Sequence, residues 1–192
     1  MEIGNTEETN LDKRVIKSKI VVCGSNAVGK TTLLRNISDQ KLEKNYIPTL
    51  GVNVSTIQLN FSSADIKSDI LLTLSIWDIA GQFFTRNLPI HKKFYNAASA
   101  AFVVYDITRK ITYEDVPEWF KTIEKNVGKQ IPYVLIGNKI DLKAERTVSE
   151  EEGFKMAEKF NCPFLETSAL TGENVKESFM KMGILLINKN KN

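Results

Sequence analysis

The sequence predicts an α/β fold, a three-layer sandwich in which helices cover both faces of a mostly parallel six-stranded sheet with one antiparallel edge strand. Two observations predict this class. Apolar runs of strand length alternate with amphipathic helical patterns along most of the 192 residues, which is typical of parallel sheets covered by helices. Two of the runs follow each other with only a polar turn between them, so we expect one β-hairpin, whose outer strand is the antiparallel edge.

Six strands are predicted from these runs. The second alternates apolar and polar residues, as a half-exposed edge strand does, whereas the third is almost continuously apolar and is expected to be buried. A polar turn is expected between them, over residues 62–68. The predicted strands are residues 15–23, 51–61, 70–77, 97–107, 132–137 and 162–166.

Four helices are predicted around these strands. The first follows a glycine-rich stretch and covers residues 29–38. The second begins with Asp115 as its N-cap and has Pro117 in its first turn. The third opens with a capping box from Ser149 to Glu152. The fourth carries apolar residues at helical spacing: Val175, Phe179, Met182 and Leu186.

Length, charge and composition bound the organisation of the chain. We expect a flexible polar extension over residues 1–14, one domain over residues 15–188 and a short polar tail over residues 189–192. The net charge of +3 comes from basic residues interleaved with carboxylates, which argues against nucleic acid as a partner. No apolar run approaches the roughly 20 residues of a membrane span. No cysteine near the end offers a lipid anchor, so we expect a cytoplasmic monomer with at most indirect membrane contact.

The stretch from Gly24 to Thr31 reads G-x-x-x-x-G-K-T, the phosphate-binding loop pattern, between a predicted strand and a predicted helix. Gly24 and Gly29 permit backbone angles that a Cβ would forbid, so successive N–H groups can curl around an anion. The N-terminal end of the helix adds partial positive charge there. Lys30 is expected to reach nucleotide phosphates and the Thr31 hydroxyl to bind Mg²⁺. A chance match in an unrelated turn is expected in about 1% of chains this long.

Three residues follow the third predicted strand at its carboxyl end, where ligands of such sheets bind. Asp78 is placed to bind Mg²⁺, usually through water. The backbone N–H of Gly81 can approach a terminal phosphate, and the Gln82 side chain can position a water for in-line attack. Taken alone, Asp78 also fits a helix cap and Gln82 a solvated loop residue.

Asn138, Lys139 and Asp141 end the fifth predicted strand in the pattern N-K-x-D. The Asp141 carboxylate can accept two N–H bonds from a guanine edge. Adenine lacks that pair of donors, so a carboxylate left unpaired would penalise the wrong base. Asn138 and Lys139 are expected to tie this segment to the phosphate loop and to cover the base. A turn with an Asx motif is the plain alternative.

Two weaker signals complete the candidate site. The last predicted strand ends in small residues, Ser168 and Ala169, which let backbone N–H groups approach a base carbonyl. An ordinary β-to-α turn fits that stretch about equally well. Thr49 lies in a polar connection and offers Mg²⁺ a second hydroxyl, which would order its loop only when a terminal phosphate is present. An ordinary loop threonine is the alternative.

These five stretches, in this order and spacing, resemble those of the Ras-like small GTPases, which are P-loop NTPases, over about residues 15–187. The resemblance implies binding of GTP and GDP with Mg²⁺ and slow hydrolysis. It also implies contacts with effector, exchange-factor and GTPase-activating proteins through switch loops at residues 41–52 and 80–95. The stretches most similar to the Rab branch are Tyr46–Val52, Trp77–Gln82, Glu166–Ala169 and Thr171–Val175.

Carried over by position, the resemblance implies a role for each motif residue. Gln82 would be the catalytic residue and would orient the attacking water. Mg²⁺ would be held by Thr31, Thr49 and Asp78. The nucleotide would be bound by Asn26, Ala27, Val28, Gly29, Lys30, Thr31, Thr32, Tyr46, Thr49, Gly81, Asn138, Lys139, Asp141, Ser168, Ala169 and Leu170.

Several residues depart from the Rab pattern. Asn26 is larger than the residue usual there and would hinder insertion of a partner's arginine next to the γ-phosphate. Ala27 also differs from the usual residue. Leu42 replaces a phenylalanine that packs on the guanine edge, so faster nucleotide exchange is expected. Phe83 replaces an acidic residue and Val54 an aromatic one, which argues against the standard Rab regulators and effectors.

The sequence thus predicts a molecular switch that hydrolyses GTP to GDP and phosphate, with a role in membrane trafficking or signalling. Ile47 stands two residues before Thr49, where an arginine acting in cis would be expected, so hydrolysis without a partner should be slow. A nucleotide-binding scaffold with little or no hydrolysis is the alternative, which Asn26 and Leu42 favour. An ATP-using P-loop kinase is disfavoured by Asp141.

Overall fold

The computed structural model describes residues 14–38, 51–63, 66–80 and 91–190 of the chain. Within these residues the strands are β1 (Arg14–Cys23), β2 (Val52–Ser63), β3 (Ile66–Ile79), β4 (Ala100–Asp106), β5 (Tyr133–Asn138) and β6 (Phe164–Thr167). They form one sheet in the order β2-β3-β1-β4-β5-β6. β2 and β3 are antiparallel, and the other neighbouring strands are parallel. The mostly parallel six-stranded sheet with an antiparallel edge strand is therefore confirmed.

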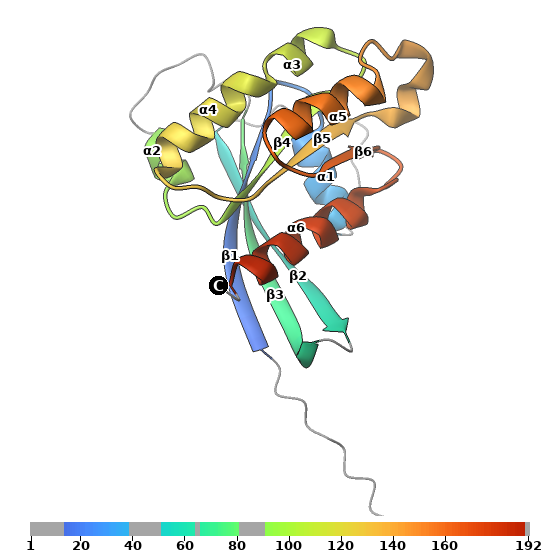
Figure 1. The fold of residues 1–192 in the computed structure, drawn as a ribbon. Helices are drawn as coiled ribbons and strands as arrows, with labels where there is room; N and C mark the ends of the chain where they lie inside the picture. The colour runs from blue at the N-terminus through green and yellow to red at the C-terminus, as the bar shows by residue number, and fades with distance from the viewer. Residues whose placement is uncertain (1–13, 39–50, 64–65, 81–90, 191–192) are drawn as a thin grey trace, which may run out of the picture.

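Helices cover both faces of this sheet, as predicted (Figure 1). On one face, α1 and α6 pack on a core that includes Leu33, Phe102 and Phe179. On the other face, α2, α4 and α5 pack on a second core that includes Tyr105 and Trp119. The helices are α1 (Lys30–Ile37), α2 (His91–Tyr95), α3 (Lys110–Glu114), α4 (Val116–Val127), a 3-10 helix (Ile140–Glu145), α5 (Glu150–Lys159) and α6 (Val175–Lys189).

The central strand β4 shows how one apolar run serves both cores. All of its residues are buried. Phe102 and Val104 belong to the core under α1 and α6, whereas Val103 and Tyr105 belong to the core under α4, because successive side chains of a strand point to opposite faces. The strand ends in Asp106, which pairs in register with Asn138 of β5. The carboxyl edge of the sheet therefore carries the polar residues.

Most strand boundaries lie within two residues of the sequence prediction, but the starts of β3 and β4 differ by more. β2 runs to Ser63 and β3 begins at Ile66, so most of the turn expected over residues 62–68 is strand. The pairing of Ser63 with Ile66, after a register shift, extends the hairpin beyond the apolar run. At the other boundary, β4 begins at Ala100 rather than at Ala97, because Ala97 has a left-handed φ of 58°.

The predicted helix starts are confirmed with one difference in bonding. Ser149 and Glu152 form the expected capping box: Ser149 Oγ accepts from the Glu152 N–H at 3.2 Å, and the Glu152 carboxylate accepts from the Ser149 N–H at 2.8 Å. Asp115 occupies the N-cap position of α4 but makes no side-chain capping bond. Its carboxylate instead accepts a hydrogen bond of 2.6 Å from the hydroxyl of Ser25. The short helix α3, just before it, was not predicted.

Most of the predicted N-terminal extension and part of the predicted tail lie outside the residues that the structure describes. Of the predicted extension over residues 1–14, the structure describes only Arg14, which opens β1. Residues 191–192 of the predicted tail lie outside the described part.

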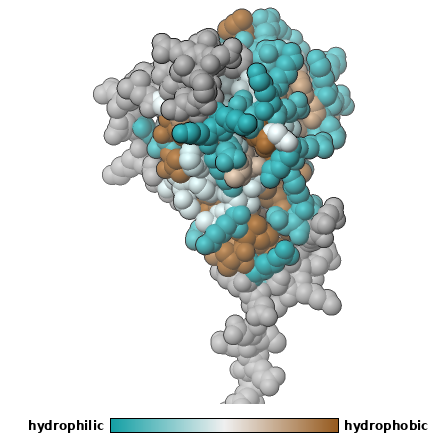
Figure 2. Space-filling model, turned by 90° about the vertical axis from the view of Figure 1, so that its left-hand side faces the viewer, coloured by the Kyte–Doolittle hydropathy of each residue, from teal (hydrophilic) through white to brown (hydrophobic). Residues whose placement is uncertain are grey.

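No described helix has the length and apolar character needed to cross a bilayer. Figure 2 shows a surface that is hydrophilic over much of its upper part and has a hydrophobic area low on the same face. Val15 of β1 and Ile184 of α6 are among the large hydrophobic side chains that stay about half exposed.

Candidate functional site

The candidate site lies at the carboxyl edge of the sheet, where residues 24–29 join β1 to α1. Gly24 and Gly29 have φ angles of 143° and 99°. A Cβ on Gly24 would come within 2.1 Å of the carbonyl oxygen of Val104, and one on Gly29 within 2.2 Å of the side-chain nitrogen of Asn138. The loop therefore requires glycine at both positions, for space as well as for backbone conformation.

Lys30 begins α1 and is only 6% exposed. Its ammonium donates to the carbonyl oxygens of Gly24, at 2.7 Å, and Ser25, at 2.9 Å. Burial lowers the pKa of Lys30 to about 8, because desolvation disfavours the charged form. Within the described residues this ammonium has no carboxylate in ion-pair contact. A buried ammonium bound only to carbonyl oxygens is suited to receive an anion.

Asp78, near the end of β3, is fully buried. Its Oδ2 accepts a hydrogen bond from the Thr31 hydroxyl, whereas its Oδ1 has no hydrogen-bond partner in the described part of the chain. Burial raises the pKa of this carboxyl group, against the hydrogen bond from Thr31. A carboxylate oxygen and a hydroxyl are ligands of the kind that Mg²⁺ prefers. The buried oxygen without a partner therefore fits that ion.

Asn138 connects three segments of the site. Its side-chain NH₂ donates to the carbonyl oxygen of Val28 at 2.8 Å. Its side-chain oxygen accepts from the hydroxyl of Thr167, at 3.0 Å, and from the backbone N–H of Ala169, at 2.9 Å. The residue is 1% exposed. These bonds tie the phosphate loop to the ends of β5 and β6, as expected for Asn138.

Asp141 and Lys139, which follow β5, contact different residues: Asp141 contacts Ser168 and Lys139 contacts Asp106. The hydroxyl of Ser168 donates to Asp141 Oδ1 at 2.6 Å, which orients the carboxylate. No described residue donates to its second oxygen, which can therefore accept from a ligand. Lys139 was expected to reach the phosphate loop, but its ammonium lies 2.7 Å from the carboxylate of Asp106. Lys139 has a left-handed φ of 77°, so its backbone turns sharply at the end of β5.

The structure brings together most of the residues that the sequence analysis predicted. Residues 26–32 form the loop and the first turn of α1, with Asp78 beside them, and the segments of Asn138 and Ser168 adjoin the loop. Leu170 follows these segments and is 63% exposed. Predicted residues that lie outside the described ones are Tyr46, Thr49, Gly81 and Gln82, together with the departures Leu42 and Phe83.

Sequence reasoning missed the residues around Asp106, which is fully buried at the end of β4. Its carboxylate accepts from Arg109 at 2.9 Å as well as from Lys139. Burial opposes ionisation, but the bonds from Lys139, Thr108 and Arg109 hold the pKa of Asp106 below its usual range. One signal was available: Asp106 ends an apolar run at the same sheet edge as Asp78 and Asn138.

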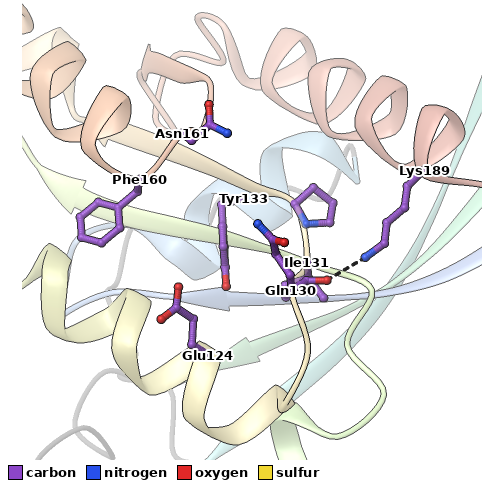
Figure 3. Close-up of a pocket in the computed structure, with 8 residues that line it drawn as sticks. Glu124, Gln130, Ile131, Tyr133, Phe160, Asn161 and Lys189 are labelled. Atoms are coloured by element: carbon purple, nitrogen blue, oxygen red, sulfur yellow. Dashed lines mark hydrogen bonds between the residues drawn. The ribbon is translucent and has the colours of Figure 1, made fainter.

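A separate recess of about 330 Å³ lies at the opposite, amino end of β5 (Figure 3). Tyr133 forms part of its wall, with Glu124 from α4 and Phe160 from the end of α5 around it. Lys189 of α6 donates to the carbonyl oxygen of Gln130 at 3.0 Å. None of the residues predicted for the candidate site lines this recess. The phosphate-loop edge and this recess are therefore different places in the fold.

Comparison with known proteins agrees with the geometry. A model of the Ras family matches residues 19–187. The Ras-related protein RABA6b of Arabidopsis thaliana is 38% identical over 164 residues, which cover 85% of this chain and 68% of the relative. Rab-1A of Dictyostelium discoideum is 35% identical over 173 residues, covering 89% and 81% of the two chains. Human Rab-4B is 36% identical over 171 residues, covering 89% and 76%.

Proposed function

This chain belongs to the Ras family of small GTPases, and from that premise we propose that it is a molecular switch that binds GTP and hydrolyses it to GDP and phosphate. The proposal rests mainly on two buried polar groups at the phosphate loop that still have room for a bonding partner. Among the residues that the structure describes, Lys30 is a buried ammonium held only by carbonyl oxygens, and Asp78 keeps one buried oxygen without a hydrogen-bond partner. A nucleotide phosphate would pair with the Lys30 ammonium, and Mg²⁺ would bind the free oxygen of the Asp78 carboxylate.

In the proposed complex, the backbone N–H groups of residues 26–32 and the Lys30 ammonium bind the phosphates. The Thr31 hydroxyl and the Asp78 carboxylate would hold Mg²⁺, with Thr49 as a proposed further ligand. When bound, that ion supplies positive charge that neutralises the phosphate oxygens. No covalent intermediate with the protein is required, because positioning and charge stabilisation account for most of phosphoryl-transfer catalysis.

Base selection is proposed for the other end of the site. The Asp141 carboxylate, oriented by Ser168, would accept from the two N–H donors on the guanine edge. The backbone N–H groups of the 168–170 segment would approach the base carbonyl. Lys139, held at its tip by Asp106, would cover the base with the apolar part of its side chain.

Hydrolysis is proposed to depend on Gln82, which would orient the attacking water, and on Gly81, whose N–H would meet the terminal phosphate. We expect the rate without a partner to be slow, because no arginine is available in the 41–52 loop to stabilise the transition state. Effectors, exchange factors and activating proteins are proposed to bind the switch loops 41–52 and 80–95. The proposed setting is the cytoplasm, with a monomer acting in trafficking or signalling.

A single-turnover experiment tests the hydrolytic part. Protein loaded with GTP and Mg²⁺ is sampled over time, and the GDP formed is measured. We expect slow conversion by the unaltered chain and slower conversion by Gln82→Leu, with GTP affinity preserved. Equal conversion by both proteins would remove Gln82 from the proposed role.

A nucleotide-binding scaffold with little hydrolysis is the second candidate. It is favoured by Asn26, an exposed residue of the phosphate loop where the family usually has a smaller one. The same single-turnover experiment separates the two candidates. Tight GTP binding without any GDP formation, alone or with an activating protein, would support the scaffold.

A further inference from the structure

Arg109, between β4 and α3, contacts the phosphate loop from outside. Its Nη2 donates to the backbone carbonyl oxygen of Asn26 at 2.8 Å, and its Nε donates to the Asp106 carboxylate at 2.9 Å. The Asp106 side chain is fully buried, whereas that of Arg109 is 39% exposed. The planar guanidinium is therefore held at one edge by a buried anion while another of its N–H groups reaches the loop.

The carbonyl that Arg109 contacts belongs to the peptide between Asn26 and Ala27. In a planar trans peptide the C=O and the N–H point in opposite directions. Since the C=O of Asn26 points to Arg109, the N–H of Ala27 points away from it. In a phosphate loop the inward-facing N–H groups are the ones that bind the anion. A charge-assisted bond to the carbonyl also polarises the peptide and strengthens its N–H as a donor.

The backbone conformation of Ala27 makes the Asn26–Ala27 peptide unfavourable in its present orientation. The φ of Ala27 is 59°, a left-handed conformation that glycine adopts freely and a residue with a Cβ does not. Rotation of the Asn26–Ala27 peptide is a direct way to relieve that conformation, and it would turn the Ala27 N–H away from the phosphates. The bond from Arg109 opposes the rotation.

Asp106 connects this contact to the base-binding segment. The same carboxylate oxygen lies 2.9 Å from Arg109 and 2.7 Å from the ammonium of Lys139. Lys139 stands between Asn138 and Asp141 in the segment proposed to bind guanine. A chain of contacts therefore runs from Lys139 through Asp106 and Arg109 to the carbonyl of Asn26.

We propose that Arg109 is a positioning residue that holds the Asn26–Ala27 peptide in its phosphate-binding orientation and thereby slows release of the nucleotide. The proposal rests on the proposed function, since it concerns the same site. It adds a residue from outside the five motifs that predicted the site.

The test measures release of a fluorescent GDP from the full chain into excess unlabelled GDP. For Arg109→Ala we expect release roughly tenfold faster, the change that corresponds to one charge-assisted hydrogen bond with partial exposure. Lys110→Ala is the matched control. This variant removes the adjacent positive charge, but the Lys110 side chain pairs with Glu152 on α5 rather than with the loop. Arg109→Lys keeps the charge with a different donor geometry and should fall between the two.

Chemical rescue separates positioning from general support of the fold. Guanidinium ion, added well below denaturing concentrations, should slow GDP release from Arg109→Ala, while tetramethylammonium at equal ionic strength should not. Faster release that guanidinium does not reverse, together with a lower melting temperature of the nucleotide-free variant, would overturn the proposal. If Arg109→Ala does not fold, Arg109→Gln and Arg109→Lys carry the same test.

The two proposals fail in different ways. If the unaltered chain binds no guanine nucleotide, the proposed function is wrong and the role of Arg109 falls with it. If the unaltered chain retains GDP and Arg109→Ala releases it at the same rate, only the role of Arg109 is overturned. Slower hydrolysis with unchanged release would also overturn it, because the residue would then act on the reaction rather than on the loop.

Discussion

The two halves of the candidate site differ in how their polar groups are satisfied. In the phosphate half, as far as the described part of the chain goes, Lys30 is bound only to backbone carbonyls and Asp78 has a buried oxygen without a hydrogen-bond partner. In the base half, Asn138 makes three hydrogen bonds and Asp141 accepts from Ser168. The base half is thus largely assembled by the chain itself, whereas the phosphate half leaves groups for a ligand to complete.

This difference suggests a division of labour. A preassembled half can select between bases without first reorganising, because its donors and acceptors are already oriented. A half with incomplete buried groups gains most from the ligand, since an unpaired buried polar group is unfavourable until it is matched. Substitutions should therefore affect ligand binding more than folding in the phosphate half, and folding as well as binding in the base half.

Lys30→Met should give the largest effect on binding. We expect GTP affinity to fall about a thousandfold, since losing one partner of a buried charge contact costs roughly 4 kcal/mol. The nucleotide-free protein should be no less stable, because the substitution removes a buried ammonium. Titration calorimetry and thermal unfolding measure the two quantities. Lys121→Met, which alters an exposed pair with Glu118, is the control, and a clear loss of stability in Lys30→Met would contradict the comparison.

Asn138→Ala should instead weaken the fold itself. Three hydrogen bonds are lost, and their buried partners on Val28, Thr167 and Ala169 are left unsatisfied, so the free energy of unfolding should fall by about 3 kcal/mol without nucleotide. Denaturant unfolding of the nucleotide-free protein measures it. Asn126→Ala removes one bond to the Thr122 carbonyl and should have a smaller effect. Equal stability of Asn138→Ala and the unaltered chain would show that the base half is not assembled by these bonds.

Asp141→Asn should change base preference more than stability, because the Asn side-chain oxygen can still accept from the Ser168 hydroxyl as Asp141 does. An Asn amide would present a donor to the guanine donors, so GTP affinity should fall about a hundredfold, the upper range for one bidentate contact. Xanthine carries a carbonyl in place of the guanine amine and should bind the variant better than guanine does. Competition between XTP and GTP reads this out. An unchanged preference for GTP would remove Asp141 from the proposed role.

The smallest expected effect is a dependence of GTP affinity on pH. The pKa of Lys30 is lowered to about 8 by burial, and bound phosphate should keep the ammonium protonated. Binding then takes up a proton above pH 8, so affinity should fall as pH rises, about tenfold between pH 7 and pH 9. Calorimetry in buffers of different ionisation enthalpy counts the protons. The same pH series on Lys30→Met should be flat over this range, and a slope that persisted there would assign the titration to another group.

Much of this architecture could be predicted from the sequence, because the patterns that carry it are local. The alternation of apolar runs indicated the strand set, and the glycine loop with Lys30 and Thr31 indicated one edge of the sheet. Asn138 was expected to bind the phosphate loop, and it does. Periodicity and turn chemistry express such features directly in the order of residues.

Most of the contacts that could not be predicted join segments distant in the sequence. Asp115 is 90 residues from Ser25, yet their side chains share a hydrogen bond in place of the expected helix cap. Arg109 reaches Asn26 over 83 residues. Lys139 bonds to Asp106 rather than to the loop. The sequence alone suggested other partners for Asp115 and Lys139, and only the tertiary arrangement decides between partners.

The most direct measurement is a competition for the Mg²⁺-dependent site of the purified, nucleotide-free chain. A fluorescent GDP is bound first, and unlabelled GTP or ATP is titrated against it with and without Mg²⁺. We predict that GTP displaces the probe at least about a hundredfold better than ATP, since the base contact distinguishes them by a pair of hydrogen bonds, and that removing Mg²⁺ weakens binding. Equal displacement by ATP and GTP, or no binding of the probe at all, would contradict a guanine-nucleotide site at this edge of the sheet.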